Sequence, residues 1–77
     1  MIFLIQYDPR KAELIRFEHF PDARRSAAER QRLKIELEVR RKALDHEVVV
    51  FQAPSEAALR RTHRRYFKSL AGLAGGR

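Results

Sequence analysis

The stretch Ile2-Phe3-Leu4-Ile5-Gln6-Tyr7 opens the chain with five apolar or aromatic side chains in six residues. Such side chains favour β-strands, and a strand buried on both faces shows a nearly unbroken apolar run. No basic leader of a signal peptide precedes this run, and it is too short to span a membrane. We therefore expect a strand at residues 2–7, in the middle of a sheet.

A turn and a second strand follow this run. Asp8 and Pro9 suit the first two positions of a type I turn. Because Pro9 cannot adopt a positive φ, we expect a longer or bulged connection rather than a tight primed hairpin. Residues 12–19 then return as the second strand. If Tyr7 pairs with Ala12, one face carries Ile2, Leu4, Ile15 and Phe17, and the other carries Phe3, Ile5, Tyr7 and Leu14.

Residues 22–44 have the pattern of a long helix. Asp22 is one candidate N-cap, and Ser26 with Glu29 matches a capping box one turn later. Opposite charges at four-residue spacing pair Arg32 with Glu36, Lys34 with Glu38, Glu36 with Arg40, Glu38 with Lys42 and Arg41 with Asp45. Leu33, Leu37 and Leu44 form one apolar stripe, and Ala28, Ile35, Val39 and Ala43 form another on nearly the opposite side. One stripe should cover the sheet, and the other needs the second helix or another subunit.

The last third of the chain predicts one more strand and one more helix. Residues 47–53 include four consecutive apolar, β-prone side chains and predict a buried strand. Pro54 ends this strand, Ser55 is a suitable N-cap, and Glu56 suits the positive end of a helix dipole. The second helix is expected at residues 56–70. Residues 1–71 should form a single domain, and residues 72–77 a flexible glycine-rich tail.

These elements predict an α+β fold of order ββαβα, with two layers. A small three-stranded sheet would be covered by the long helix and by the shorter basic helix. Strand order 2-1-3 is favoured over 1-2-3, because it places the apolar first strand in the middle. With both helices on one face, the other face would be left apolar and open. We therefore expect a homodimer, joined through that face or through the spare stripe of the long helix.

The net charge of +7 is concentrated near the C-terminus. Residues 54–77 carry six basic residues against one acidic residue, whereas residues 1–20 carry three of each. Read as a helix, this segment places Leu59, His63, Tyr66 and Leu70 on one side, with Phe67 at the edge. The opposite side carries the candidate binding residues, which are Arg60, Arg61, Arg64, Arg65 and Lys68. Arg10, Lys11, Arg24 and Arg25 are candidate auxiliary contacts.

A basic helix face indicates an acidic partner without naming it. Arginine forks suit phosphate oxygens, so DNA or RNA is the first candidate, and an acidic protein is the second. We expect Tyr66 and Phe67 to pack inward rather than stack on bases, because their spacing matches the apolar face. The element order fits neither a helix-turn-helix nor a double-stranded RNA-binding domain. An anionic membrane surface is disfavoured, because so small a domain needs these apolar residues in its core.

The chain lacks the residue patterns of an enzyme. There is no cysteine, and His19, His46 and His63 share no metal-ligand spacing. No serine or threonine has an evident base beside it, and neither a Walker loop nor a dinucleotide fingerprint occurs. We expect no catalytic residue, cofactor or metal, and a cytoplasmic location. The sequence thus favours a small non-enzymatic binding module that contacts a nucleic acid backbone through its basic second helix. The alternative is a protein-interaction or assembly module whose basic face meets an acidic protein.

Overall fold

The computed structural model describes residues 1–68 and has the predicted ββαβα order. Its strands are β1 (Ile2–Asp8), β2 (Glu13–Phe20) and β3 (Glu47–Gln52), and its helices are α1 (Arg25–Arg41) and α2 (Glu56–Thr62). Two short 3₁₀ segments, η1 (Asp22–Arg24) and η2 (Arg64–Phe67), precede α1 and follow α2. The α+β class is therefore confirmed. The predicted glycine-rich tail at residues 72–77 lies outside the described residues.

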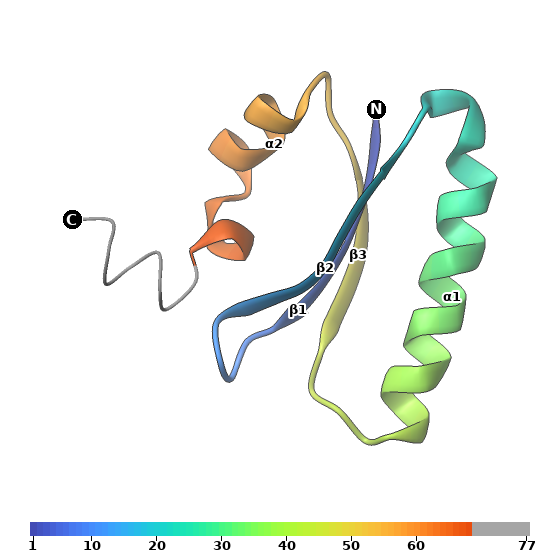
Figure 1. Ribbon diagram of the computed structural model, residues 1–77, viewed down its shortest axis with the longest axis vertical. Helices are drawn as coiled ribbons and strands as arrows, with labels where there is room; N and C mark the ends of the chain where they lie inside the picture. The colour runs from blue at the N-terminus through green and yellow to red at the C-terminus, as the bar shows by residue number, and fades with distance from the viewer. Residues whose placement is uncertain (69–77) are drawn as a thin grey trace.

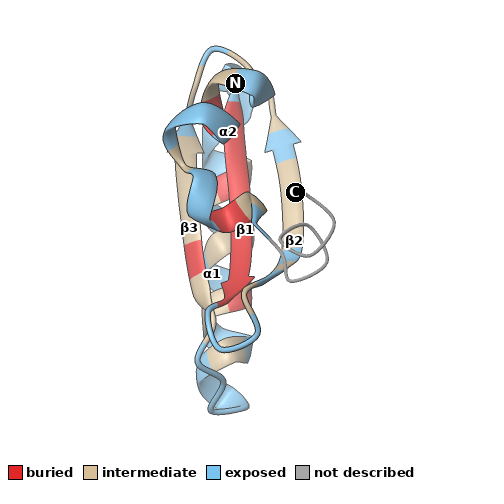
Figure 2. Cartoon of the chain, turned by 90° about the vertical axis from the view of Figure 1, so that its left-hand side faces the viewer, coloured by how far each residue is buried: buried red, intermediate tan, exposed pale blue. Residues whose placement is uncertain are grey.

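The sheet has the order β2-β1-β3, as the apolar first strand predicted. β1 pairs antiparallel with both neighbours, and all seven of its residues are buried (Figure 2). A central strand is covered by helices on its faces and by strands on its edges, so it needs apolar side chains in both directions. That requirement explains why β1 shows an apolar run instead of an alternating pattern.

The hairpin register differs from the predicted pairing of Tyr7 with Ala12. Tyr7 is opposite Leu14, and the register shifts between Gln6 and Tyr7, so Ile15 is an extra residue in β2. This bulge leaves Ile15 exposed and moves Phe17 to the face that carries Phe3, where the two rings stack at 5.7 Å. The face predicted for Phe17 was therefore wrong, because one bulged residue inverts the side-chain alternation of the residues on one side of it.

The turn before β2 explains how this register is reached. The Asp8 Oδ1 atom accepts hydrogen bonds from the backbone N–H groups of Arg10 at 3.0 Å and Lys11 at 3.4 Å. Ala12 completes the connection with a φ of 51°. The longer connection predicted from Pro9 is confirmed, and it extends through Ala12.

The two helices cover opposite faces of the sheet (Figure 1). α1 packs Ile35 against Leu4 and Val48, while α2 and η2 pack Leu59 and Tyr66 against Phe3, Ile5 and Tyr7. The molecule therefore has three layers, and the predicted two-layer arrangement with both helices on one face was wrong. Alternate residues of β1 supply the two cores, so within residues 1–68 each face of the sheet packs against a helix.

The ends of α1 are built differently from the sequence prediction. Ser26 lies inside the helix, and no side chain caps its first turn, so the predicted capping box does not form. At the other end, Ala43 has a φ of 53°, its N–H donates to the Arg40 carbonyl, and the Leu44 N–H donates to the Val39 carbonyl. This pair of bonds is a Schellman motif, which ends the helix at Arg41 rather than at residue 44.

The ion pairs of α1 also differ from the predicted set. Among those predicted, only Glu38 with Lys42 is present, at 3.6 Å. Arg32 instead pairs with Glu29 and Arg41 with Glu38, both at three-residue spacing, and Asp45 pairs with Arg10 of the hairpin turn. Three- and four-residue spacings place side chains at similar separations on a helix, so spacing alone does not choose between partners.

Candidate nucleic-acid interface

The candidate site begins with α2, whose first turn forms as the sequence predicted. The Ser55 hydroxyl oxygen accepts a hydrogen bond from the Ala58 N–H at 3.1 Å. Glu56 lies in the first turn, where the helix dipole favours negative charge. Leu59 is completely buried and anchors the helix on the core shared with Phe3 and Ile5.

α2 ends at Thr62, eight residues before the end predicted for it. The Thr62 hydroxyl donates to the carbonyl of Ala58 or Leu59, at 3.2 and 3.3 Å, and His63 then leaves helical geometry with φ −126° and ψ 54°. Thr side chains that bond to their own helix backbone weaken helix continuation. One continuous helix over residues 56–70 was therefore wrong, and Leu70 lies outside the described residues.

The break at His63 brings both aromatic residues of η2 onto the sheet. Tyr66 packs edge-on against Tyr7 at 5.2 Å and also contacts Phe51, and Phe67 packs edge-on against Phe17 at 5.3 Å. The inward position predicted for Tyr66 and Phe67 is confirmed. Neither ring is presented as a platform for a nucleic acid base.

Arg65 connects η2 to the sheet by an ion pair with Glu47 of β3. Its guanidinium donates to both carboxylate oxygens of Glu47, at 2.7 and 2.9 Å, and stacks over the rings of Tyr7 and Tyr66. The Tyr66 hydroxyl donates to the same carboxylate at 3.2 Å. Hydrogen bonding from Arg65 lowers the pKa of Glu47, while burial and then the Glu47 charge raise the pKa of Tyr66.

Arg60 also has interaction partners within the domain. Its Nε–H donates to Glu56 at 2.9 Å, one helical turn earlier, and its guanidinium lies 4.4 Å from the centre of the Phe67 ring. Arg60 therefore helps to hold α2 against η2. It keeps its positive charge, but a partner would have to compete with Glu56 for its hydrogen bonds.

Three of the five predicted binding residues remain exposed without an acidic neighbour. Arg61, Arg64 and Lys68 are exposed, and within residues 1–68 none of them forms an ion pair. We call these three residues the basic cluster. The structure thus divides the predicted face into two arginines that stabilise the fold and three cations that point into solvent.

The predicted auxiliary residues do not gather around the basic cluster. Arg24 and Arg25 lie at the start of the α1 layer, on the other side of the sheet from α2 (Figure 1), and Arg25 donates to Gln52. Arg10 and Lys11 lie in the hairpin turn, where Arg10 pairs with Asp45 at 2.9 Å. Of these four side chains, Arg10 and Arg25 already have partners within the domain.

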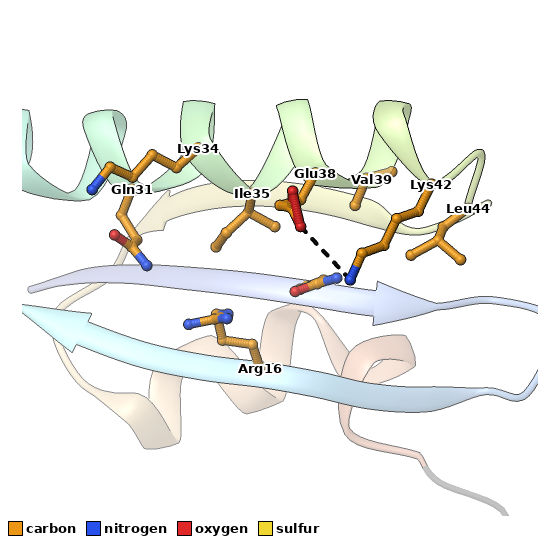
Figure 3. Close-up of a pocket in the computed structure, with 9 residues that line it drawn as sticks. Arg16, Gln31, Lys34, Ile35, Glu38, Val39, Lys42 and Leu44 are labelled. Carbon is orange, nitrogen blue, oxygen red and sulfur yellow. Dashed lines mark ion pairs between the residues drawn. The ribbon is translucent and has the colours of Figure 1, made fainter.

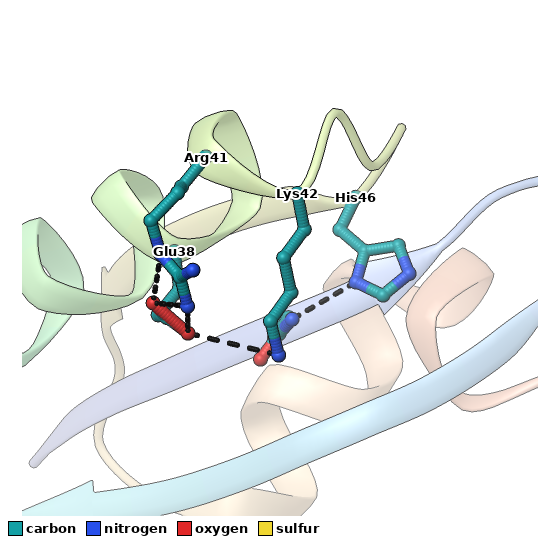
Figure 4. A network of polar contacts seen from close by, with 5 residues as sticks. Glu38, Arg41, Lys42 and His46 are labelled. Atoms are coloured by element: carbon teal, nitrogen blue, oxygen red, sulfur yellow. Dashed lines mark hydrogen bonds and ion pairs between the residues drawn. The ribbon is translucent and has the colours of Figure 1, made fainter.

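A second polar network lies under the C-terminal end of α1. Arg41 and Lys42 both contact Glu38, and the His46 ring lies beside them (Figure 4). His46 Nδ1 is 2.9 Å from the amide nitrogen of Gln6, and its Nε2 is 3.6 Å from an Asp8 carboxylate oxygen. The His46 contacts join the segment after α1 to the central strand β1. Gln6 and His46 are 40 positions apart, so sequence spacing gives no signal for this contact, whereas Glu38 and Lys42 have the four-residue spacing predicted from the sequence.

A groove of about 290 Å³ runs between α1 and β2, bordering this network (Figure 3). Its polar lining mixes Arg16, Lys34 and Lys42 with Glu38 and the two amides of Gln6 and Gln31. No serine, threonine or histidine lines it. Within the described chain there is also no group of three side chains suited to hold a metal ion.

Comparison of the chain with protein-family models, with curated proteins and with solved structures finds no match. In residues 1–68, no helix is both long and apolar enough to cross a membrane.

Proposed function

We propose that this protein is a small non-enzymatic module that contacts the phosphate backbone of a nucleic acid through the basic cluster. The observation that supports this most is that the basic residues of α2 and η2 fall into two groups, those with an acidic partner and those without one. Arg60 and Arg65 are engaged by Glu56 and Glu47, whereas Arg61, Arg64 and Lys68 are exposed on the same segment without ion pairs in the described chain.

The rigidity of the supporting layer favours binding at this surface. The break at His63 is held between buried Leu59 and buried Tyr66, and the Glu47–Arg65 pair ties η2 to β3. Cations carried on a fixed backbone lose less conformational entropy on binding than cations on a loose tail. Contact with phosphates would release counterions, which gives a sequence-independent and salt-sensitive affinity.

The features of the site favour backbone contact over base reading. The aromatic side chains of η2 face the sheet, so bases have no stacking platform there. A helix of seven residues followed by a break is also a short element for entry into a major groove. We therefore expect affinity that depends weakly on sequence.

A salt titration of binding to labelled duplex DNA, single-stranded DNA and RNA tests the proposal. The affinity for duplex DNA should fall with salt by a slope of about 0.9 per phosphate contact, or about 2.7 if all three cations make contact. The variant Arg61→Glu/Arg64→Glu/Lys68→Glu should lose at least tenfold in affinity while it keeps its circular dichroism spectrum. The matched control is Arg30→Glu/Lys34→Glu/Arg40→Glu, which changes the net charge equally on α1, across the sheet.

Two results would reject the proposal. If both triple variants lose the same affinity, the binding reflects net charge and not this surface. If the wild-type protein binds none of the three nucleic acids near 0.15 M salt, the basic cluster serves another purpose. Saturable binding of an acidic protein, lost in the α2–η2 variant alone, would then favour the second candidate, a protein-interaction module.

A further inference from the structure

The outer face of α1 is the most exposed apolar surface of the described chain. Leu33 and Leu37 are each 57% exposed, more than any other large apolar side chain there. Ala28 and Ile35, the two buried residues of α1, lie on the opposite side and face the sheet. The structure thus shows which of the two predicted stripes is spare, namely the one that contains Leu33 and Leu37.

The outward residues of α1 follow the spacing of a coiled-coil seam. Starting from Ser26, steps of four, three, four and three residues lead along one face of the helix. The residues of this seam are Ser26, Arg30, Leu33, Leu37 and Arg40. Ala28 and Ile35 occupy the heptad position farthest from such a seam, which agrees with their burial against the sheet.

The charges beside the seam are sorted by sign. Glu29 and Glu36 lie on one flank, and Lys34 and Arg41 lie on the other. In a parallel pair of helices, the acidic flank of one copy meets the basic flank of the other. Each acidic flank residue then faces the partner residue that lies five positions later in the sequence. In an antiparallel pair, each flank meets its own copy. The parallel arrangement therefore brings opposite charges together, and the antiparallel one brings like charges together.

We propose that α1 pairs in parallel with α1 of a second copy of this chain. Leu33 and Leu37 would each meet their own counterpart across the two-fold axis. Glu29 would face Lys34 of the partner subunit, and Glu36 would face Arg41 of the partner subunit. In the single chain Glu29 pairs with Arg32 and Arg41 pairs with Glu38. All four side chains are at least 39% exposed, so exchanging these pairs for intermolecular ones changes little burial.

The seam fits a weak dimer rather than an obligate one. Two leucine layers are flanked by arginines, and α1 has only 17 residues. The contact therefore belongs to the small end of specific interfaces, below about 1,200 Å² in total. We expect the mass to rise from that of the 9.1 kDa monomer toward the dimer between about 10 µM and 1 mM protein.

Sedimentation equilibrium over this concentration range tests the contact. Leu33→Glu/Leu37→Glu should remain monomeric throughout, with an unchanged circular dichroism spectrum. Ile15→Glu, which alters an exposed apolar residue on β2, is the matched control and should associate like the wild type. A wild-type mass that stays at 9.1 kDa, or a dimer that survives the double substitution, would overturn the proposal.

A thiol introduced by Ser26→Cys tests the orientation, because the chain contains no cysteine. In the parallel dimer the two thiols meet across the seam. Oxidised glutathione would then take up their two electrons and two protons, which yields an intermolecular disulfide and two reduced glutathione molecules. Adding Leu33→Glu/Leu37→Glu to this variant should reduce the cross-linking at least tenfold. A dimer that gives no cross-link would refute the parallel arrangement.

The charge pattern gives an independent check on orientation. Glu29→Lys/Glu36→Lys should abolish the parallel dimer, and the further changes Lys34→Glu/Arg41→Glu in the same chain should restore it. An antiparallel dimer would respond to neither step. The variant Arg61→Glu/Arg64→Glu/Lys68→Glu alters a surface across the sheet and should dimerise normally. The control variant of the nucleic-acid test changes Arg30, Lys34 and Arg40 of the seam, so nucleic-acid binding is measured below about 10 µM protein, where the chain is monomeric, and the two tests then fail independently.

Discussion

Substituting Leu59→Ala measures how strongly α2 is held on the sheet. Leu59 is 0% exposed and is the only buried residue of α2, so it provides the main apolar anchor of a seven-residue helix. Leu→Ala changes at buried sites cost about 2–5 kcal/mol, made up of lost transfer free energy and the cavity left behind. Because α2 lies at the surface and can settle partly into the space, we expect about 3 kcal/mol.

This loss is large for a domain of this size. A 77-residue protein has a stability of about 4–12 kcal/mol, and each kcal/mol shifts the melting temperature by about 4–8 °C. Urea and thermal unfolding followed by circular dichroism would measure the change. Leu33→Ala, at a site 57% exposed, is the matched control and should cost less than about 0.5 kcal/mol at concentrations where the protein is monomeric. Equal costs for the two variants would show that α2 does not pack as described.

Three further substitutions have expected outcomes. Ala43→Gly should raise the melting temperature by a few degrees, because Ala43 has a φ of 53° and glycine adopts this conformation without the steric cost. Glu47→Gln should weaken the loss of stability below about pH 4.5. The pKa of Glu47 is lowered in the folded state, so its carboxylate stabilises the fold at pH values above the ordinary pKa of glutamate, and this contribution is lost as the pH falls. Tyr66→Phe should reduce the loss of stability above about pH 10, because a raised pKa favours the neutral phenol in the folded state. Unfolding free energies measured across pH test the last two changes, and unchanged pH profiles would contradict them.

Much of the fold was predictable because it depends on short-range patterns. The apolar run at residues 2–7 indicated a central strand, and the Pro54-Ser55-Glu56 sequence located the start of α2. The separation of Ala28 and Ile35 from Leu33 and Leu37 followed from helical periodicity, although the sequence did not show which stripe would be buried. That choice depends on the shape and composition of the sheet face that the helix covers.

The errors came from features that local patterns do not determine. One extra residue at Ile15 moved Phe17 to the other face, and nothing in the local sequence distinguishes a bulge from a regular strand. The placement of the helices on opposite faces depends on how the chain crosses the sheet. For the candidate site, the pairing of Arg65 with Glu47 joins residues 18 positions apart, so spacing rules for helices could not find it. The exposure of Arg61, Arg64 and Lys68 agrees with the predicted outward face.

The position of β1 in the sheet has a consequence for how the chain folds. β1 is the middle strand in space but the first in sequence, and its second partner, β3, pairs Gln52 with Ile2 across a separation of 50 residues. The β1–β2 hairpin can form early, but a two-stranded hairpin is at best marginally stable in water. Closing the long loop that brings β3 alongside carries the entropic cost of non-local contacts, which slows folding. Until that closure, one edge of the most apolar strand is bare, so the interval before β3 docks is when this chain is most prone to aggregate.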